Sequence, residues 1–157
     1  MKVVINTCYG GFSLSRKAVK RLAELQGKEC YFYSKGGLNT AYVKIEETDI
    51  NERLCLWFAF TVGNPDKLNE MLNSENWHEM SKAEKAAYNK RYKEIYLSDK
   101  PDNRADNLLI QVVEELGEDA NGAFAKLKIV DIPDGTDYEI SEYDGYEHIA
   151  EKHRTWS

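Results

Sequence analysis

The sequence is poor in proline, in cysteine and in long apolar runs. Its 157 residues include three prolines and three cysteines. Cys8, Cys30 and Cys55 are far apart and form no CxxC pair, which argues against a zinc knuckle and favours reduced thiols in a cytosolic protein. No apolar run approaches the roughly 20 residues that cross a bilayer. The polar Asn6 interrupts the first apolar stretch too early for a signal peptide, so we expect a cytoplasmic protein without a membrane span.

Positive charge is scarce in the last third of the chain. The net charge is −6. The run from Asp131 to Glu151 holds eight acidic residues and no Lys or Arg. This balance argues against broad binding to nucleic acid or to anionic lipid. The acidic run is either a solvated face or a surface that meets a basic partner.

Four helices are predicted from capping signals and apolar periodicity. They cover residues 16–26, 65–72, 82–93 and 107–116. Ser15 and Asp106 are typical N-caps, and Ser81 with Glu84 matches a capping box. Gly27 is expected to end the first helix. The polar stretch 64–100 is predicted to be a peripheral, more mobile insertion.

Strand-like runs occupy much of the remaining sequence. They are residues 2–6, 30–34, 40–46, 54–62, 94–98 and 126–132, followed by a hairpin of 137–143 and 148–156 around Asp144-Gly145. Apolar, aromatic-rich runs of this length favour strands. We predict one α+β domain over residues 1–157, with a mixed or antiparallel sheet of about six strands and two or three helices on one face. The runs 2–6, 54–62 and 126–132 are expected to share that sheet.

A glycine-rich segment between the first strand and the first helix is the first candidate ligand site. Cys8, Tyr9, Gly10 and Gly11 precede the helix, which begins with two basic residues, Arg16-Lys17. Glycines allow backbone N–H groups to approach a ligand, and a helix start favours anions. The segment is either a phosphate or carboxylate site or a tight turn that leads into an ordinary helix with a basic face.

The end of the chain is the second candidate ligand site. In a strand, His148, Lys152, Arg154 and Trp156 would share one side. Cations beside an aromatic plane suit a nucleotide, through phosphate contacts and base stacking. The alternative is an edge strand held by ion pairs. We expect the Cys8–Ser15 loop and the Lys152–Trp156 strand to border one pocket.

Cys8 is also the one candidate nucleophile, with His148 or His153 as its base. No Asn or Asp is placed to orient either histidine, and a small packed thiol is the alternative. No His, Cys or carboxylate cluster has metal-ligand spacing. We therefore expect a binding protein rather than an enzyme, with neither metal nor cofactor.

Three long motifs resemble a family of small proteins encoded largely by bacteriophages and prophages. The motifs are VVINTCYGGFSLS, LLIQVVEELGEDANGAFAKLKIVDIPD and YEISEYDGYEHIAEKHRTW. The resemblance covers about residues 3–26 and 104–156. This chain departs from the pattern at Arg16-Lys17, where the family tends to have acids, and at Asn107, where it tends to have proline. The family has no assigned activity, so the resemblance implies a setting and not a mechanism.

These observations give three expectations for function. The first is a phage accessory protein of the host cytoplasm, active against host defence, that binds a small anionic, nucleotide-like ligand. The second is an acidic inhibitor that binds a host protein through the 131–151 run. The third is a small enzyme that uses Cys8. A homo-oligomer is compatible with each.

Overall fold

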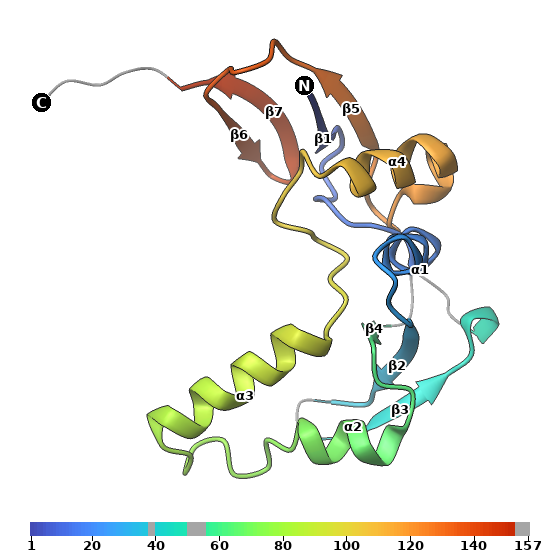
Figure 1. Cartoon of the computed structure of the whole chain (residues 1–157), viewed down its shortest axis with the longest axis vertical. Coiled ribbons are helices and arrows are strands. Elements are labelled where there is room, and N and C mark those ends of the chain that lie inside the picture. The colour runs from blue at the N-terminus through green and yellow to red at the C-terminus, as the bar shows by residue number, and fades with distance from the viewer. Residues whose placement is uncertain (38–39, 50–55, 153–157) are drawn as a thin grey trace, which may run out of the picture. The chain divides into compact units, whose positions relative to one another are not determined.

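The computed structural model describes residues 1–37, 40–49 and 56–152, and the chain divides into two compact units (Figure 1). Unit 1 comprises residues 1–26 and 99–157, and unit 2 comprises residues 27–98. Unit 2 is therefore inserted into the chain of unit 1. The stretches that carry the phage-family resemblance lie within unit 1. None of the helices in the described ranges is long and apolar enough to cross a membrane.

Unit 1 contains two antiparallel strand pairs and two helices. Its elements are β1 (Lys2–Asn6), α1 (Arg16–Leu25), α4 (Asn107–Leu116), a 3-10 helix, η2 (Gly117–Ala120), β5 (Leu127–Asp131), β6 (Tyr138–Tyr143) and β7 (Tyr146–Glu151). β1 pairs with β5, and β6 pairs with β7. Helix α4 packs against β1, β5 and α1. The core between them is aliphatic, with Val4, Leu109 and Val112 fully buried.

The N-caps predicted for the two helices of unit 1 are confirmed. The Ser15 side chain accepts a hydrogen bond from the Ala18 amide, and the Asp106 side chain accepts from the Leu108 and Leu109 amides. Gly117 ends α4 with a φ of 55°, in the left-handed region that favours glycine.

Unit 2 is a three-stranded antiparallel sheet with two helices. Its elements are β2 (Tyr31–Lys35), β3 (Tyr42–Ile45), the 3-10 helix η1 (Glu47–Asp49), β4 (Trp57–Phe60), α2 (Pro65–Met71) and α3 (Lys82–Ile95). The strand order is β3-β2-β4. Tyr33, Tyr42 and Phe60 form the centre of its core, with mutual ring-centroid distances of 5.2–6.5 Å. The predicted capping box of Ser81 and Glu84 begins α3.

The α+β class and the antiparallel pairing are confirmed, but the sheet membership predicted for 54–62 is wrong. In the described ranges the strands form three sheets, and β4 pairs with β2 and not with β1 or β5. Residues 54 and 55 lie outside those ranges. The physical reason is aromatic packing, because the Phe58 and Phe60 rings lie 5.4 and 5.2 Å from the ring of Tyr42. An apolar run predicts burial but does not identify its partner strand.

Two further boundaries differ from prediction. Helix α3 continues to Ile95 where a strand over 94–98 was expected. Leu97 then donates to the Ala59 carbonyl at 2.9 Å, so only the residues after the helix pair with β4. The inserted unit begins at residue 27, earlier than the 64–100 that polar composition indicates. Leu68 and Leu72 of α2 belong to its buried core. The greater mobility of 64–100 stays a prediction.

Candidate functional site

The glycine-rich loop after β1 is packed against residues 122–126. The Cys8 thiol donates to the Phe124 carbonyl at 2.9 Å and approaches Asn6 Oδ1 at 3.3 Å. A Cβ placed on Gly10 would lie 1.8 Å from the same Phe124 carbonyl oxygen. Gly11 has a φ of +82°. The glycines therefore let two backbone segments approach each other, which accounts for them without a ligand.

Asn6 is the central polar residue of this region, and its role was not predicted. It is fully buried at the end of β1. Its Nδ2 donates to the Cys8 carbonyl at 2.7 Å and to the Gly145 carbonyl at 2.6 Å. Its Oδ1 accepts from the Lys126 amide at 2.8 Å. One side chain thus joins the loop, the β6–β7 turn and the start of β5. A polar residue that ends an apolar strand is the signal that could have found it.

The loop meets the turn of the C-terminal hairpin. Asp144 and Gly145 have positive φ values of 50° and 85°, as a type I′ turn requires. A Cβ on Gly145 would lie 2.4 Å from the Gly11 amide nitrogen. The rings of Tyr9 and Tyr146 lie 5.7 Å apart. The predicted contact of this loop was with the opposite end of the hairpin, at residues 152–156.

Glu147 fixes the hairpin to β1. Its Oε2 accepts the Asn6 backbone amide at 2.7 Å, and its Oε1 lies 3.5 Å from Arg104 Nη2. The Arg104 Cζ lies 3.2 Å from the centroid of the Phe12 ring. Burial lowers the pKa of Arg104, while the negative charges of Glu147 and Asp102 oppose that shift. The pair is largely removed from solvent, so loss of one partner would leave the charge of the other buried and uncompensated.

Two basic side chains of α1, at its start and in its middle, face acidic partners. Lys17 Nζ lies 3.0 Å from Asp119 Oδ2, and Arg21 Nε lies 2.8 Å from Glu115 Oε2. Arg16 is half-buried at the first helical position. These ion pairs reduce the positive potential that an anion would meet at the predicted site.

Lys152 lies at the far end of β7 from the loop. It follows Tyr146 by six positions, which is about 20 Å along a strand at 3.3 Å per residue. Its Nζ lies 3.3 Å from Asp137 Oδ1. The structure does not bring Lys152 to the Cys8–Gly11 loop. The other predicted members of that strand, His153, Arg154 and Trp156, lie outside the described residues.

The geometry around Cys8 fits packing rather than catalysis. Its sulfur contacts a carbonyl and an amide oxygen, and within the described ranges no histidine hydrogen-bonds to it. His148 is exposed on β7. The described part of the chain contains no group of three His, Cys, Asp or Glu side chains that could hold a metal ion.

Four exposed aromatic side chains gather around the loop and the hairpin turn. We call them the aromatic patch: Tyr9, Phe124, Tyr143 and Tyr146, with 69%, 62%, 78% and 40% of their surface exposed. Tyr143 is directly opposite Tyr146 across the hairpin. Phe124 adjoins Gly10, as the short distances above show. The exposed Asp144 lies next to Tyr143 in the turn, so the patch has an acidic border.

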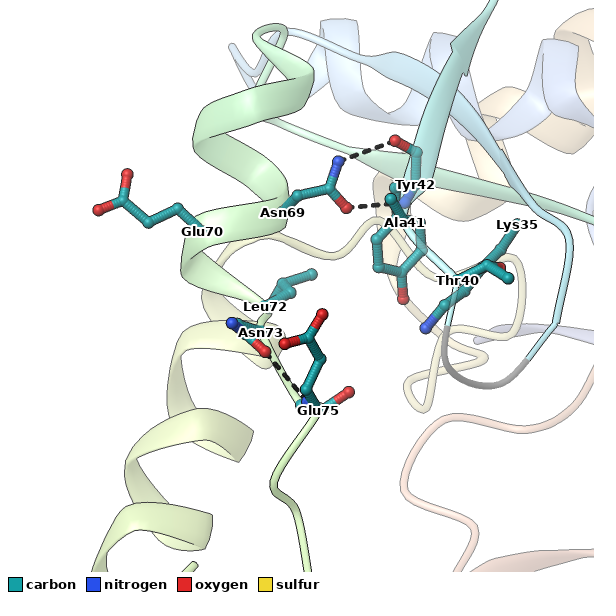
Figure 2. Close-up of a pocket in the computed structure, with 10 residues that line it drawn as sticks. Lys35, Thr40, Ala41, Tyr42, Asn69, Glu70, Leu72, Asn73 and Glu75 are labelled. Carbon is teal, nitrogen blue, oxygen red and sulfur yellow. Dashed lines mark hydrogen bonds between the residues drawn. The ribbon is translucent and has the colours of Figure 1, made fainter.

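Unit 2 has a separate cavity of about 290 Å³ between the start of β3 and the end of α2 (Figure 2). Asn69 closes one side, since its Oδ1 accepts from the Tyr42 amide at 2.7 Å and its Nδ2 donates to the Tyr42 carbonyl at 2.9 Å. Lys35 Nζ lies 4.7 Å from the Tyr42 ring centroid. Glu70 and Glu75 lie at the border of the cavity. The side chain of Glu70 points away from the cavity in Figure 2. These groups of opposite charge favour no single class of ligand.

Comparison of the chain with models of protein families, with curated proteins and with solved structures finds no match.

Proposed function

We propose that the protein binds a basic partner protein through the aromatic patch and the acidic hairpin beside it. The observation that carries this proposal is the exposure of four aromatic side chains from three chain segments at one place in unit 1. Contiguous exposed apolar surface is uncommon on soluble proteins and marks interaction sites. Tyrosine and phenylalanine are enriched at the centres of protein interfaces, where they supply much of the binding energy.

The patch rests on a fixed support. Asn6 binds both the loop that carries Tyr9 and the turn that separates Tyr143 from Tyr146. Its Oδ1 also holds Lys126, two residues after Phe124. Backbone segments that are already positioned lose less conformational entropy on binding, which supports affinity.

The charge of the surroundings indicates the chemistry of the partner. Glu139, Glu142 and Asp144 are exposed on β6 and its turn. The run from residue 131 to 151 contains no Lys or Arg. An acidic surface attracts a positively charged partner and speeds its association. Salt screens that attraction.

The resemblance to phage-encoded proteins supports a role for this binding in the host cytoplasm. The partner would be a host factor with a basic groove, such as a defence factor, and the phage protein would inhibit it by occupying that groove. Sequestration of a small anionic ligand has less support, because Lys17 and Arg21 of α1 lie against carboxylates.

Affinity capture from bacterial lysate, followed by titration of the captured protein, tests the proposal. Tyr143→Ser should weaken binding by about tenfold or more, as loss of an interface aromatic does. Val43→Ser is the matched control, because Val43 is 60% exposed but lies in unit 2. Binding should also weaken with salt. A partner that responds equally to both substitutions, or a co-purifying nucleotide and no protein partner, would contradict the proposal.

A further inference from the structure

Strand β6 is the edge of its sheet. It pairs with β7 over its whole length, from Tyr138 opposite Glu151 to Tyr143 opposite Tyr146. Among the described residues no second strand pairs with β6. Figure 1 shows β7 between β6 and β1, so the other long side of β6 faces away from these two strands.

The backbone groups on that outer side can be identified from one hydrogen bond. The Lys152 amide donates to the Asp137 carbonyl at 2.9 Å. In an antiparallel pair the residues that bond across the ladder alternate along each strand. Residues 139, 141 and 143 therefore direct their N–H and C=O groups toward β7. Tyr138, Ile140 and Glu142 direct theirs outward.

This edge lacks several features with which proteins block strand addition. The β6 sequence YEISEY has no proline or lysine, and its register shows no bulge. Its charges are the carboxylates of Glu139 and Glu142. A second copy of this strand would bring two more carboxylates and no cation. A basic strand brings the opposite charge, which stabilises cross-strand pairs.

We propose that the outer edge of β6 accepts an extended, basic segment of the partner protein as an added strand. This inference rests on the proposed function and names its binding mode. The backbone of the added segment would bond to Tyr138, Ile140 and Glu142, as in other cases of strand addition. Glu139 and Glu142 project from opposite faces of β6, so Lys or Arg side chains on one face of the segment would lie opposite one of these two carboxylates. Pairs of opposite charge at that position stabilise a sheet. Its end would reach the aromatic patch at Tyr143.

Amide hydrogen exchange of the full chain with a model peptide tests this mode. The probe is a short acetylated peptide of alternating lysine and valine, and the control peptide has glutamate in place of lysine. On binding, the amides of Tyr138, Ile140 and Glu142 should exchange about tenfold more slowly, because they become hydrogen-bonded. The amides of residues 139, 141 and 143 should not change, because they already bond to β7. Equal slowing of both sets, no slowing, or no binding of the lysine peptide would overturn the proposal.

A proline substitution provides the matched variant. Ile140→Pro removes an outward N–H and leaves the β6–β7 bonds in place, since proline is tolerated on an edge strand where its nitrogen faces solvent. It should weaken peptide binding about tenfold, and Ile140→Val should not. Exchange at residues 139 and 141 shows whether the hairpin of the variant is intact. If the hairpin is disrupted, the test rests on the unaltered protein, in which the amides of residues 138, 140 and 142 but not those of residues 139, 141 and 143 should be protected by the peptide.

Partner binding by the Tyr143→Ser and Ile140→Pro variants distinguishes this inference from the proposed function. Partner binding that depends on Tyr143 and survives Ile140→Pro would refute strand addition and leave the aromatic patch as the site. Partner binding that is indifferent to Tyr143→Ser would refute the proposed function itself.

Discussion

The cores of the two units are built from different kinds of side chain. In unit 1 the fully buried residues are aliphatic, such as Val4 and Val112, together with the polar Asn6. In unit 2 the centre is aromatic, with Tyr33 and Phe60 fully buried and tyrosines around them. Aromatic side chains each bury about 150–250 Å² and add ring–ring contacts, so a few of them stabilise a small unit.

The two units also differ in where their aromatic side chains lie. In unit 2 most of them are packed in the core. Unit 1 keeps an aliphatic core and places Tyr9, Phe124 and Tyr143 on its surface. The shape of that surface depends on the hydrogen bonds of one buried amide side chain, at Asn6. We therefore expect unit 2 to respond most to loss of ring packing and unit 1 to loss of a polar group.

Phe60→Ala should give the largest effect. Phe60 contacts the rings of Tyr33, Tyr42, Tyr92 and Tyr96. Its truncation should cost unit 2 about 3–5 kcal/mol of unfolding free energy, through lost burial and a cavity. Chemical denaturation followed by two-dimensional NMR should show unit 2 unfolding first, with the amide signals of unit 1 retained. Phe124→Ala, at an exposed phenylalanine of unit 1, is the control and should change stability little. Simultaneous loss of both sets of signals would show that the units are not independent.

Asn6→Ala should have the next largest effect, confined to unit 1. It removes donors to Cys8 and Gly145 and the acceptor for Lys126. Leaving buried groups unsatisfied costs about 1–3 kcal/mol each, so we expect a loss of about 2–3 kcal/mol after partial rehydration. Asn107→Ala, at an exposed asparagine of α4, is the control.

The same substitution tests the support of the aromatic patch. Asn6→Ala should speed hydrogen exchange in residues 8–11 and 144–146, and it should weaken partner binding at temperatures where unit 1 remains folded. Exchange rates that match those of Asn107→Ala would contradict the role given to Asn6.

Local features of the fold could be predicted from the sequence. Ser15, Ser81 and Asp106 cap helices because their side chains reach amides only two or three residues away. The Asp144-Gly145 turn was predictable for the same reason, since two adjacent residues determine it. The partner of Trp57–Phe60 was not predictable, because pairing with β2 depends on contacts across about 25 residues of chain.

The candidate site was predictable only in part. The loop of Cys8 to Gly11 was identified as a special segment, but its glycines contact Phe124 and Gly145, more than a hundred residues away in the chain. Lys17 was predicted to contact a ligand. Its ion pair with Asp119 could not be foreseen, because the two residues are about a hundred positions apart in the chain. Asn6 and Phe124 were missed, because burial and exposure of single residues depend on the tertiary fold.

Alkaline pH should destabilise unit 2 through tyrosines of its aromatic core, with the smallest effect of the three. Burial, with a smaller contribution from Tyr96 and Tyr88, raises the pKa of Tyr92 from 10.0 to about 12, and burial also raises that of Tyr42. A tyrosine whose pKa is raised by folding contributes full stability below its unfolded pKa. Between pH 10 and 12 the unfolded chain ionises first, so the stability of unit 2 should fall across this range.

Fluorescence of the tryptophans during alkaline titration measures this effect, because Trp57 and Trp77 lie in unit 2. Tyr92→Phe is the decisive variant, since a phenylalanine ring fills nearly the same volume and cannot ionise. It should move the alkaline midpoint of unit 2 to higher pH while leaving its stability at pH 7 nearly unchanged. The effect of one partly exposed ring is modest, because solvent reduces the cost of its charge. An alkaline midpoint that is the same for both proteins would mean that Tyr92 ionises without unfolding the unit, and the ring contacts of the aromatic core would then hold it together despite a charge on one of its tyrosines.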